Sequence, residues 1–168
     1  MANRKRAARA GAIAAPQQAA HEAPPGFAGG YLAYLLARAS FIVSAEFHAA
    51  LPQWDLSVPE WRVLACLKDS EGLTVGHLAA MALMKQPRIT KVLDRMERDG
   101  LVRRRVMPGD RRRVSVRLTA AGRARVRPVL AAAKAHEAEL LAAFSAAERD
   151  IIKAALHLLI ERRGGGAG

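Results

Sequence analysis

The chain has 168 residues, of which 51% are hydrophobic and 5% aromatic, and this suits one alanine-rich helical domain with a core of its own. Its single cysteine, Cys66, excludes an internal disulfide and a cysteine-based zinc cluster. The formal net charge of +12 predicts a polyanionic partner, such as nucleic acid or an acidic membrane.

The first 30 residues are rich in Ala, Pro, Gly and Gln, which predicts a flexible arm over residues 1–30. This arm begins with basic residues but lacks the apolar segment of a secretory signal. No uninterrupted apolar run long enough to span a membrane follows it. We therefore expect a cytoplasmic protein that does not act at a membrane.

Two helices are predicted in the next part of the chain. Residues 31–51 are dense in apolar side chains with neither Gly nor Pro among them, which predicts a long, largely buried helix that ends before Pro52. A second helix is predicted from Pro59 to about Asp69, because proline is tolerated in a first turn and Glu71-Gly72 interrupts the apolar pattern.

Two short helices are predicted close together after this break. Thr74 is expected to cap the first, with Leu78 and Met81 directed inward, and Pro87 marks the start of the second, which Gly100 closes. On a helical wheel the second helix has an apolar side and a separate basic side. The apolar side comprises Ile89, Val92, Leu93 and Met96, and the basic side comprises Arg88, Lys91, Arg95 and Arg98.

The hydrophobic period then changes from helical to alternating. Residues 101–106 and 113–118 form two short β-type runs with Pro108-Gly109-Asp110 as the turn between them, which predicts a β-hairpin. A hairpin directly after a helix-turn-helix is a wing. The expected fold class is therefore mostly α with a small β-hairpin wing (α+β), with a winged helix-turn-helix over residues 59–118.

Two further helices are predicted to complete the chain. Thr119 is expected to cap a long helix with a kink at Pro128, and the capping box of residues 145–148 opens the last helix. We expect residues 31–163 to form a single domain and residues 164–168 to form a disordered glycine tail.

The positive charge is concentrated between Lys85 and Arg127, where 15 basic and 4 acidic residues carry +11 of the net charge. A basic amphipathic helix alone is usually only a solvated face, and charge on a hairpin can serve merely to prevent edge-to-edge aggregation. Six arginines within residues 103–113 exceed that need, and phosphates would neutralise them. The two features together predict a helix that enters the major groove of double-stranded DNA beside a wing that contacts the backbone.

The same stretch matches the motifs of a known family. Five residues fill the positions of a wing signature: Asp110, Arg112, Val116, Leu118 and Thr119. Residues 86–102 are similar to the recognition helix that precedes such a wing. On these motifs the stretch from Trp61 to Gly122 resembles the multiple antibiotic resistance regulator (MarR) family, and residues 31–162 fit its order of elements.

The resemblance implies a homodimeric transcriptional repressor that binds a pseudopalindromic operator. In that family the first, fifth and sixth helices form the dimer, which assigns dimerisation here to residues 31–51 and 119–163. Apolar faces on these terminal helices agree with the assignment.

The predicted DNA contacts come from the recognition helix and the wing. The helix supplies Lys85, Gln86, Arg88, Thr90, Lys91 and Arg95, and the wing supplies Arg104, Asp110, Arg111 and Arg112. The resemblance implies that Arg88, Thr90 and Lys91 face the major groove and that Arg111 or Arg112 reaches the minor groove. Asp110 would brace the wing against Arg95, and residues 103–105 would anchor phosphates.

The resemblance also implies a small-molecule inducer, commonly an aromatic acid, bound between the first, second and fifth helices. The side chains here that suit an aromatic carboxylate are Arg38, Phe41, His48, Trp54, Trp61 and Arg62. Phe41 and Trp61 fit a plain core better than a ligand site, and Arg38 and His48 fit a polar rim better than a ligand contact. A narrower resemblance to repressors of aromatic-acid degradation, such as those answering hydroxylated nicotinate, points to aromatic compound catabolism.

Other functions receive less support from the sequence. A redox sensor needs an accessible thiolate, whereas Cys66 lies on the expected buried face of its helix. A metal sensor built from His136, Glu137, Glu139 and His157 lacks tight ligand spacing, and no catalytic motif occurs. We therefore expect no metal, no cofactor and no enzymatic activity. The alternative is an architectural or non-specific nucleic-acid-binding protein without an inducer.

Overall fold

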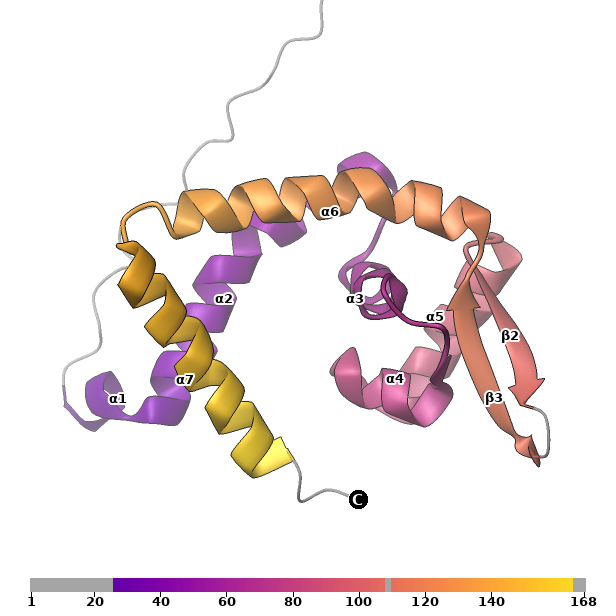
Figure 1. The fold of residues 1–168 in the computed structure, drawn as a ribbon, viewed down its shortest axis with the longest axis horizontal. Helices are drawn as coiled ribbons and strands as arrows, with labels where there is room; N and C mark the ends of the chain where they lie inside the picture. The colour runs from indigo at the N-terminus through magenta and orange to yellow at the C-terminus, as the bar shows by residue number, and fades with distance from the viewer. Residues whose placement is uncertain (1–25, 108–109, 165–168) are drawn as a thin grey trace, which may run out of the picture. The chain divides into compact units, whose positions relative to one another are not determined.

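The structure of the protein, a computed structural model, describes residues 26–107 and 110–164. It is mostly helical with one small antiparallel sheet (Figure 1), which confirms the fold class expected from the sequence. The described residues divide into two compact units that meet between Ser40 and Phe41, inside one helix.

The first unit holds helix α1 (Phe27–Gly30) and the beginning of helix α2 (Leu32–Ala50). Tyr31 between them has an extended backbone, and its ring stacks on that of Phe27 with the centroids 5.1 Å apart. The arm predicted over residues 1–30 therefore carries a short helix at its end. Residues 1–25 of this arm lie outside the described part of the chain.

Helix α2 agrees with the predicted helix over 31–51 to within one residue at each end. The expectation that it is largely buried is wrong for the single chain, in which Phe47 is the only buried residue of the helix. Phe41, for example, is 75% exposed. Apolar density along a helix indicates that its faces need covering, but it does not say whether the same chain covers them.

The second unit starts with the end of α2 and a short 3₁₀ turn, η2 (Leu51–Trp54). The helix-turn-helix that follows comprises α3 (Val58–Leu67), α4 (Val75–Met81) and α5 (Gln86–Arg98). Helix α3 opens on a capping box in which the N–H of Ser57 donates to Glu60 Oε2 at 2.8 Å. As predicted, Thr74 caps α4, because its Oγ1 accepts from the N–H of His77.

The core of this unit is formed by the end of α2, η2 and the residues after it, α3, α4, α5, the sheet and the first half of α6. Its fully buried side chains include Val63, Leu64, Leu67, Leu78, Ile89, Leu93, Met96, Val116 and Val129. The predicted apolar side of α5 is thus confirmed. The prediction that Met81 points inward is wrong: it is 46% exposed, because α4 ends there and the fully buried Ala82 fills the next core position.

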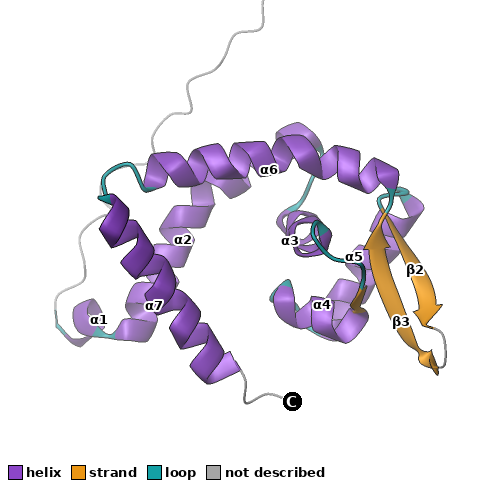
Figure 2. Ribbon diagram, viewed as in Figure 1, coloured by secondary structure: helices purple, strands orange, loops and turns teal. Residues whose placement is uncertain are grey.

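The wing belongs to a three-stranded antiparallel sheet of order β1-β3-β2, drawn in orange in Figure 2. Its strands are β1 (Leu73–Thr74), β2 (Val102–Met107) and β3 (Asp110–Leu118). The predicted hairpin corresponds to β2 and β3, whereas β1 was not expected, because two residues are too few to show alternation. Arg103 lies opposite Arg117, and Arg104 lies opposite Val116. Since successive side chains of a strand point to opposite faces, Arg103 and Arg104 belong to opposite faces of the wing.

Helix α6 (Ala120–Leu140) follows the wing, and α7 (Ala146–Gly164) ends the described chain. As predicted, Thr119 caps α6, with its Oγ1 accepting from the N–H of Gly122 at 2.9 Å. Helix α6 runs through Pro128 without a break, and the kink expected there stays a prediction. The predicted capping box of α7 is present, since the N–H of Ser145 donates to Glu148 Oε2 at 2.8 Å. In the described part of the chain, no helix is both long and apolar enough to cross a membrane.

Candidate nucleic-acid interface and ligand cavity

Helix α5 presents its basic side to solvent while its apolar side is held in the core. Burial of Ile89, Leu93 and Met96 fixes the rotation of the helix about its axis. The residues predicted to contact DNA from the start of this helix are all exposed: Lys85, Gln86, Arg88, Thr90 and Lys91. Among the described residues, no carboxylate pairs with Lys85, Arg88 or Lys91. Three cationic side chains are therefore available to a polyanion.

The N-terminus of α5 adds a partial positive charge to this surface, because the helix dipole ends there. Its N-cap residue, Lys85, makes no side-chain hydrogen bond to the first turn. Pro87 has no N–H, and the N–H of Arg88 donates to the Lys85 carbonyl at 3.0 Å, which leaves the N–H of Gln86 for another acceptor, such as a phosphate oxygen. One turn further on, the hydroxyl of Thr90 donates to the carbonyl of Gln86 at 3.0 Å, which holds the threonine side chain against the helix.

Arg95 is held by carboxylates on its own and a neighbouring helix. Its Nε lies 3.3 Å from Oε1 of Glu60, which is 6% exposed, and 3.7 Å from Oδ2 of Asp99. The same Glu60 closes the capping box of α3, so one nearly buried carboxylate ties α5 to the start of α3. The predicted brace between Arg95 and Asp110 stays a prediction, since the Asp110 side chain lies outside the described residues.

Arg104 joins the wing to α5. Its Nη1 lies 2.7 Å from Asp94 Oδ1 and 2.9 Å from Glu97 Oε2, and its backbone N–H donates to Glu97 Oε1 at 2.9 Å. The side chain is 24% exposed, so the guanidinium is largely occupied within the chain. A phosphate that contacted Arg104, as predicted, would have to compete with these two carboxylates. In the structure Arg104 ties the wing to α5 and so positions it.

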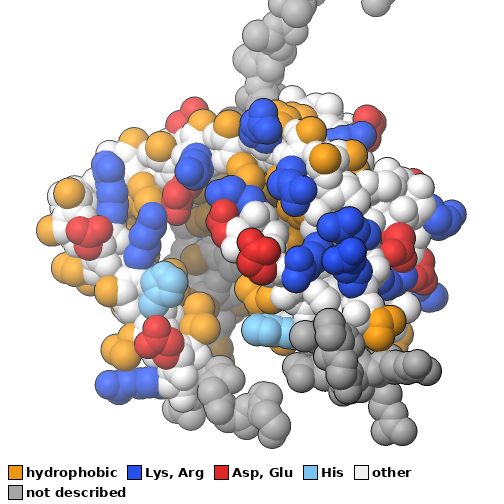
Figure 3. All heavy atoms as spheres, turned by 45° about the vertical axis from the view of Figure 1, so that its right-hand side comes forward, with side chains coloured by type: hydrophobic (Ala, Val, Ile, Leu, Met, Phe, Trp, Pro, Cys, Tyr) orange, Lys and Arg blue, Asp and Glu red, His pale blue; other side chains and the backbone are white. Residues whose placement is uncertain are grey.

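The other arginines of the wing are less constrained. Arg103 and Arg105 are exposed on the face opposite to Arg104, where they suit contact with a polyanion. The side chains of Arg111 and Arg112, predicted to reach the minor groove, lie outside the described residues, as does the turn at 108–109. Figure 3 shows Lys and Arg side chains gathered on the side of the molecule that bears the wing.

A cavity of about 380 Å³ lies between the end of α2, α3 and α6, all within the second unit. Its lining residues are Val43, Trp61, Ala65, Leu130, Ala133, Lys134, His136, Glu137 and Leu140. The Trp61 ring packs edge-on against Phe47 with the centroids 5.2 Å apart, and Phe47 lies 5.8 Å from the ring of His136. Aromatic and aliphatic walls with a lysine and a histidine beside them suit a flat, anionic small molecule.

Two polar groups that line this cavity have no hydrogen-bond partner among the described residues. The Nε2 atom of His136 is buried and has no hydrogen-bond partner among the described residues; the nearest carboxylate oxygen, from Glu46, is 3.8 Å away. Lys134 is exposed and unpaired in the described part of the chain, whereas Glu137 is engaged by Lys153 at 3.1 Å. The site therefore has free hydrogen-bonding capacity for a carboxylate.

The predicted ligand residues are only partly brought together. Trp61 lines the cavity, but Phe41 and Trp54 do not, and the Trp54 carbonyl instead accepts from Arg125 Nη1 at 3.1 Å. Arg38 lies in the first unit, where its Nη1 donates to Tyr34 Oη at 3.1 Å.

His48 and Arg62, also predicted ligand residues, lie near each other but do not line the cavity. Burial, and secondly the Arg62 guanidinium, hold the pKa of His48 below its ordinary value. The lowered pKa favours the neutral form of His48.

The resemblance placed the inducer against the fifth helix, which is α6, but the sequence argument named none of the α6 residues that line the cavity. Leu130, Ala133, Lys134 and Glu137 recur at the spacing of one helix face, and this pattern could have been found. The sequence suggests a role for His136 only as a ligand of a metal sensor. The described residues bring together no group of three potential metal-binding side chains, and His136 borders the cavity instead.

Cys66 is half-buried on α3, close to Arg62. Burial raises the pKa of its thiol, and the nearby guanidinium opposes this shift only in part. A raised pKa lowers the thiolate fraction, which makes the group a poor redox sensor.

Known proteins share this arrangement. A family model described as the MarR family matches residues 56–114, which include the helix-turn-helix and part of the wing. The transcriptional repressor Rv2887 of Mycobacterium tuberculosis is 33% identical over 128 residues, which make up 76% of this chain and 92% of that protein. The repressor IacR of Pseudomonas putida is 36% identical over 89 residues, and the match spans 53% of each chain.

Solved structures show the same similarity. The MarR family transcriptional regulator SPO1453 from Silicibacter pomeroyi superposes with a TM-score of 0.71 at 45% identity, covering 81% of this chain and 97% of that one. Rv2887, solved as a complex with salicylic acid, superposes with a TM-score of 0.64 at 32% identity, covering 77% of this chain and 96% of that one.

Proposed function

Since this chain belongs to the MarR family, whose members are transcriptional regulators and not enzymes, we propose that it is a homodimeric repressor released from its operator by a small aromatic acid. The observation that carries this proposal is the start of α5, where Lys85, Arg88 and Lys91 are exposed and unpaired among the described residues. Residues 59–118 read the DNA, and residues 31–51 and 119–163 hold two chains together.

The DNA contact follows from the geometry of α5 and the wing. Arg88 and Lys91 donate to guanine edges or phosphates, and Gln86 can pair bidentately with adenine. Arg95 and Arg104 act mainly as positioning residues, because carboxylates already hold them against α3 and α5. We assign the minor-groove contact to Arg111 or Arg112 at the tip of the wing.

Dimerisation is supported by helices that one chain leaves uncovered. No side chain described for α7 is buried, and four of its large apolar residues are exposed: Ile151, Leu156, Leu158 and Ile160. A helix of 19 residues gains most of its stability from packing of its apolar face, so α7 needs a cover. A second copy supplies one, and two copies of α5 related by a twofold axis match a pseudopalindromic operator.

The cavity beside Trp61 is the proposed inducer site. Its volume of about 380 Å³ is large enough for a single-ring acid, Trp61 offers a flat wall, and Lys134 offers a charge for the carboxylate. The relative Rv2887 forms a complex with salicylic acid, which supports an acid of that class here. Because α3 belongs to the DNA-reading part and α6 to the dimerisation part, a ligand between them can couple the two.

Binding to a defined operator tests the first half of the proposal. Sites located by genomic footprinting are compared with shuffled duplexes of equal length in gel-shift titrations at physiological salt. A repressor should prefer its operator by about 10³-fold or more. Equal affinities would instead favour an architectural, non-specific nucleic-acid-binding protein.

Tryptophan fluorescence tests the inducer site directly, because the chain has two tryptophans and only Trp61 lines the cavity. In a Trp54→Phe variant, a panel of hydroxybenzoates, salicylate and hydroxynicotinates is titrated against the fluorescence of Trp61. An inducer should shift the emission saturably and release operator DNA, and Trp61→Ala should abolish release without weakening operator binding. A panel with no such compound would contradict the aromatic-acid inducer.

A further inference from the structure

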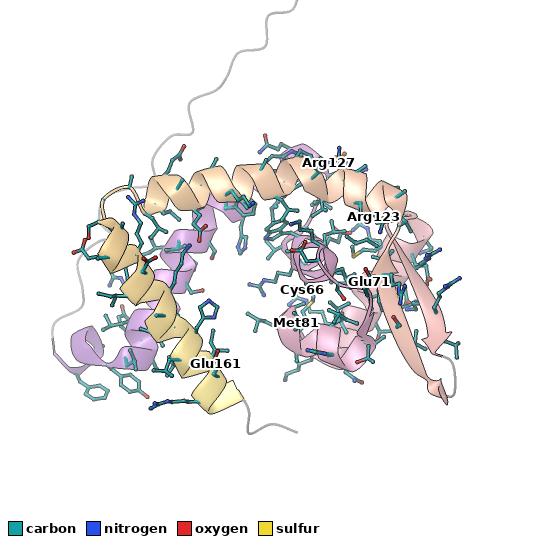
Figure 4. All side chains as sticks on the ribbon, viewed as in Figure 1. Cys66, Glu71, Met81, Arg123, Arg127 and Glu161 are labelled. Atoms are coloured by element: carbon teal, nitrogen blue, oxygen red, sulfur yellow. The ribbon has the colours of Figure 1, made fainter. Side chains whose placement is uncertain are left out.

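The outer face of the wing root, opposite to the face that contacts α5, carries a second and very different cavity. It has a volume of about 460 Å³ and lies between the end of α3, the sheet and the start of α6. Four cationic side chains, Lys68, Arg103, Arg117 and Arg123, line it together with the carboxylates of Asp69 and Glu71. Figure 4 labels Arg123 near the start of α6 and Glu71 beside the wing.

One lining residue of this cavity, Arg117, has a hydrogen-bond donor that lacks an acceptor among the described residues. Its Nε is buried and has no acceptor among the described residues. The side chain lies close over Gly72, where a Cβ would come within 2.8 Å of that Nε, so the backbone of the α3–β1 connection holds the guanidinium in place. A buried donor without an acceptor is unfavourable, and an anion that accepts from it would remove the penalty.

The positive charge around Arg117 is not balanced within the described chain. Arg103 stands directly opposite it across the two strands, a like-charge pair that is destabilising unless something neutralises it. Asp69 is already paired with Lys68 at 3.0 Å, which leaves Glu71 as the one free carboxylate of the lining. Arg123 is oriented but not neutralised, because its Nη1 donates to the Leu118 carbonyl at 3.0 Å.

We propose that this cavity binds a phosphate group. Three guanidinium groups facing one free carboxylate suit a compact anion of charge near −2, whose several oxygens can accept from more than one arginine. The other cavity has a tryptophan and several aliphatic residues that suit an aromatic acid, whereas Leu118 is the one apolar side chain among the described residues that line this cavity. The phosphate comes either from a DNA strand that passes the wing root or from a free phosphorylated molecule.

Nitrogen-15 NMR of the arginine Nε–H groups of the full-length protein tests the proposal at the atom that motivates it. Inorganic phosphate, pyrophosphate and duplex DNA are titrated separately at matched ionic strength. Arg117→Gln and Arg123→Gln remove lining residues, and Arg127→Gln is the matched control, because Arg127 is an exposed arginine one turn along α6 and outside the cavity.

A free phosphorylated ligand is indicated if phosphate or pyrophosphate shifts the Arg117 Nε–H resonance saturably. Each cavity variant should then bind about tenfold more weakly, since a charge-assisted hydrogen bond is lost, and the control should bind within about twofold. A DNA phosphate is indicated if only the duplex shifts this resonance and each cavity variant lowers the slope of log affinity against log salt by about 0.9.

Two results would overturn the proposal. In the first, none of the three titrants shifts the Arg117 Nε–H resonance saturably. In the second, the Arg127→Gln control loses as much affinity as the cavity variants do. The experiment does not depend on the operator or on the inducer. A protein that lacks operator preference or aromatic-acid response can still show the phosphate shift, so failure of the proposed function is distinguishable from failure of this inference.

Discussion

Replacing Gly122 by alanine tests how closely the wing packs on α6. Gly122 is buried in the first turn of α6, and a Cβ there would overlap the Leu101 carbonyl oxygen. It would also lie 3.0 Å from the Leu101 carbonyl carbon and 3.3 Å from Leu118 Cδ2. The carbonyl cannot easily yield, because it accepts from the backbone N–H of Thr119 at 3.1 Å, and the Thr119 hydroxyl fixes the adjacent Gly100 carbonyl by donating to it at 2.6 Å.

We expect Gly122→Ala to lower the free energy of unfolding, although helix propensity alone would raise it. In an exposed helix interior the same change stabilises by about 1 kcal/mol. Here overpacking costs about 1–3 kcal/mol, and disturbing the hydrogen bond from the Thr119 N–H to the Leu101 carbonyl costs about 1 kcal/mol more. We therefore expect the free energy of unfolding to fall by about 2 kcal/mol, and Tm by about 4–8 °C in a chain of this size.

Urea unfolding followed by circular dichroism measures this change, with all variants at one protein concentration because association adds to stability. Ala121→Gly is the matched control: Ala121 is the exposed neighbour in the same turn, and this variant should lose no more than about 1 kcal/mol. A Gly122→Ala protein as stable as the native chain would refute the close contact between α6 and Leu101.

Three further predictions follow from single residues. Leu83 has a φ of +56°, a left-handed backbone conformation that strains a residue with a side chain, and it is 76% exposed. Leu83→Gly should therefore raise the free energy of unfolding by about 0.5–1 kcal/mol in the same urea assay. A lower free energy of unfolding would contradict the backbone strain. Arg104→Gln should speed amide hydrogen exchange in β2 and leave the slope of log DNA affinity against log salt nearly unchanged, because Arg104 pairs with carboxylates of α5. Arg88→Gln should instead lower that slope by about 0.9. Equal slopes for the two variants would refute the assignment of Arg104 to positioning and of Arg88 to DNA contact. The pKa of His48 is lowered on folding, chiefly by burial, so the unfolded chain binds its proton more tightly and stability should fall as pH drops below about 6.5. His48→Gln should flatten that fall in thermal melts across the acidic range, and an unchanged pH profile would count against it.

Much of the fold could be predicted because its signals are local. The period of apolar residues placed α2, α3 and α5, and Thr74, Thr119 and residues 145–148 cap their helices as expected. The exposed start of α5 was also predictable, since the apolar side of an amphipathic helix determines where its basic side lies.

The resemblance indicated which helices meet at the proposed ligand cavity, but its lining residues were harder to predict, because they depend on how these helices pack. Trp61 was expected there, but Lys134 and His136 come from α6, more than 70 residues further along the chain. No local pattern links these positions. Conversely, Phe41 and Trp54 have suitable chemistry for an aromatic acid and lie outside the cavity.

The sequence alone determined the fold class, the family and the helix that we propose reads DNA, because periodicity, capping residues and a wing motif are properties of neighbouring residues. Only the tertiary structure decided which basic residues are free. In the structure Arg95 pairs with Glu60, and Arg104 pairs with Asp94 and Glu97. The sequence does not distinguish these paired arginines from those that stay unpaired. The reason is physical: an arginine's availability depends on the carboxylates that folding brings within about 4 Å, and that proximity is not written in the local sequence.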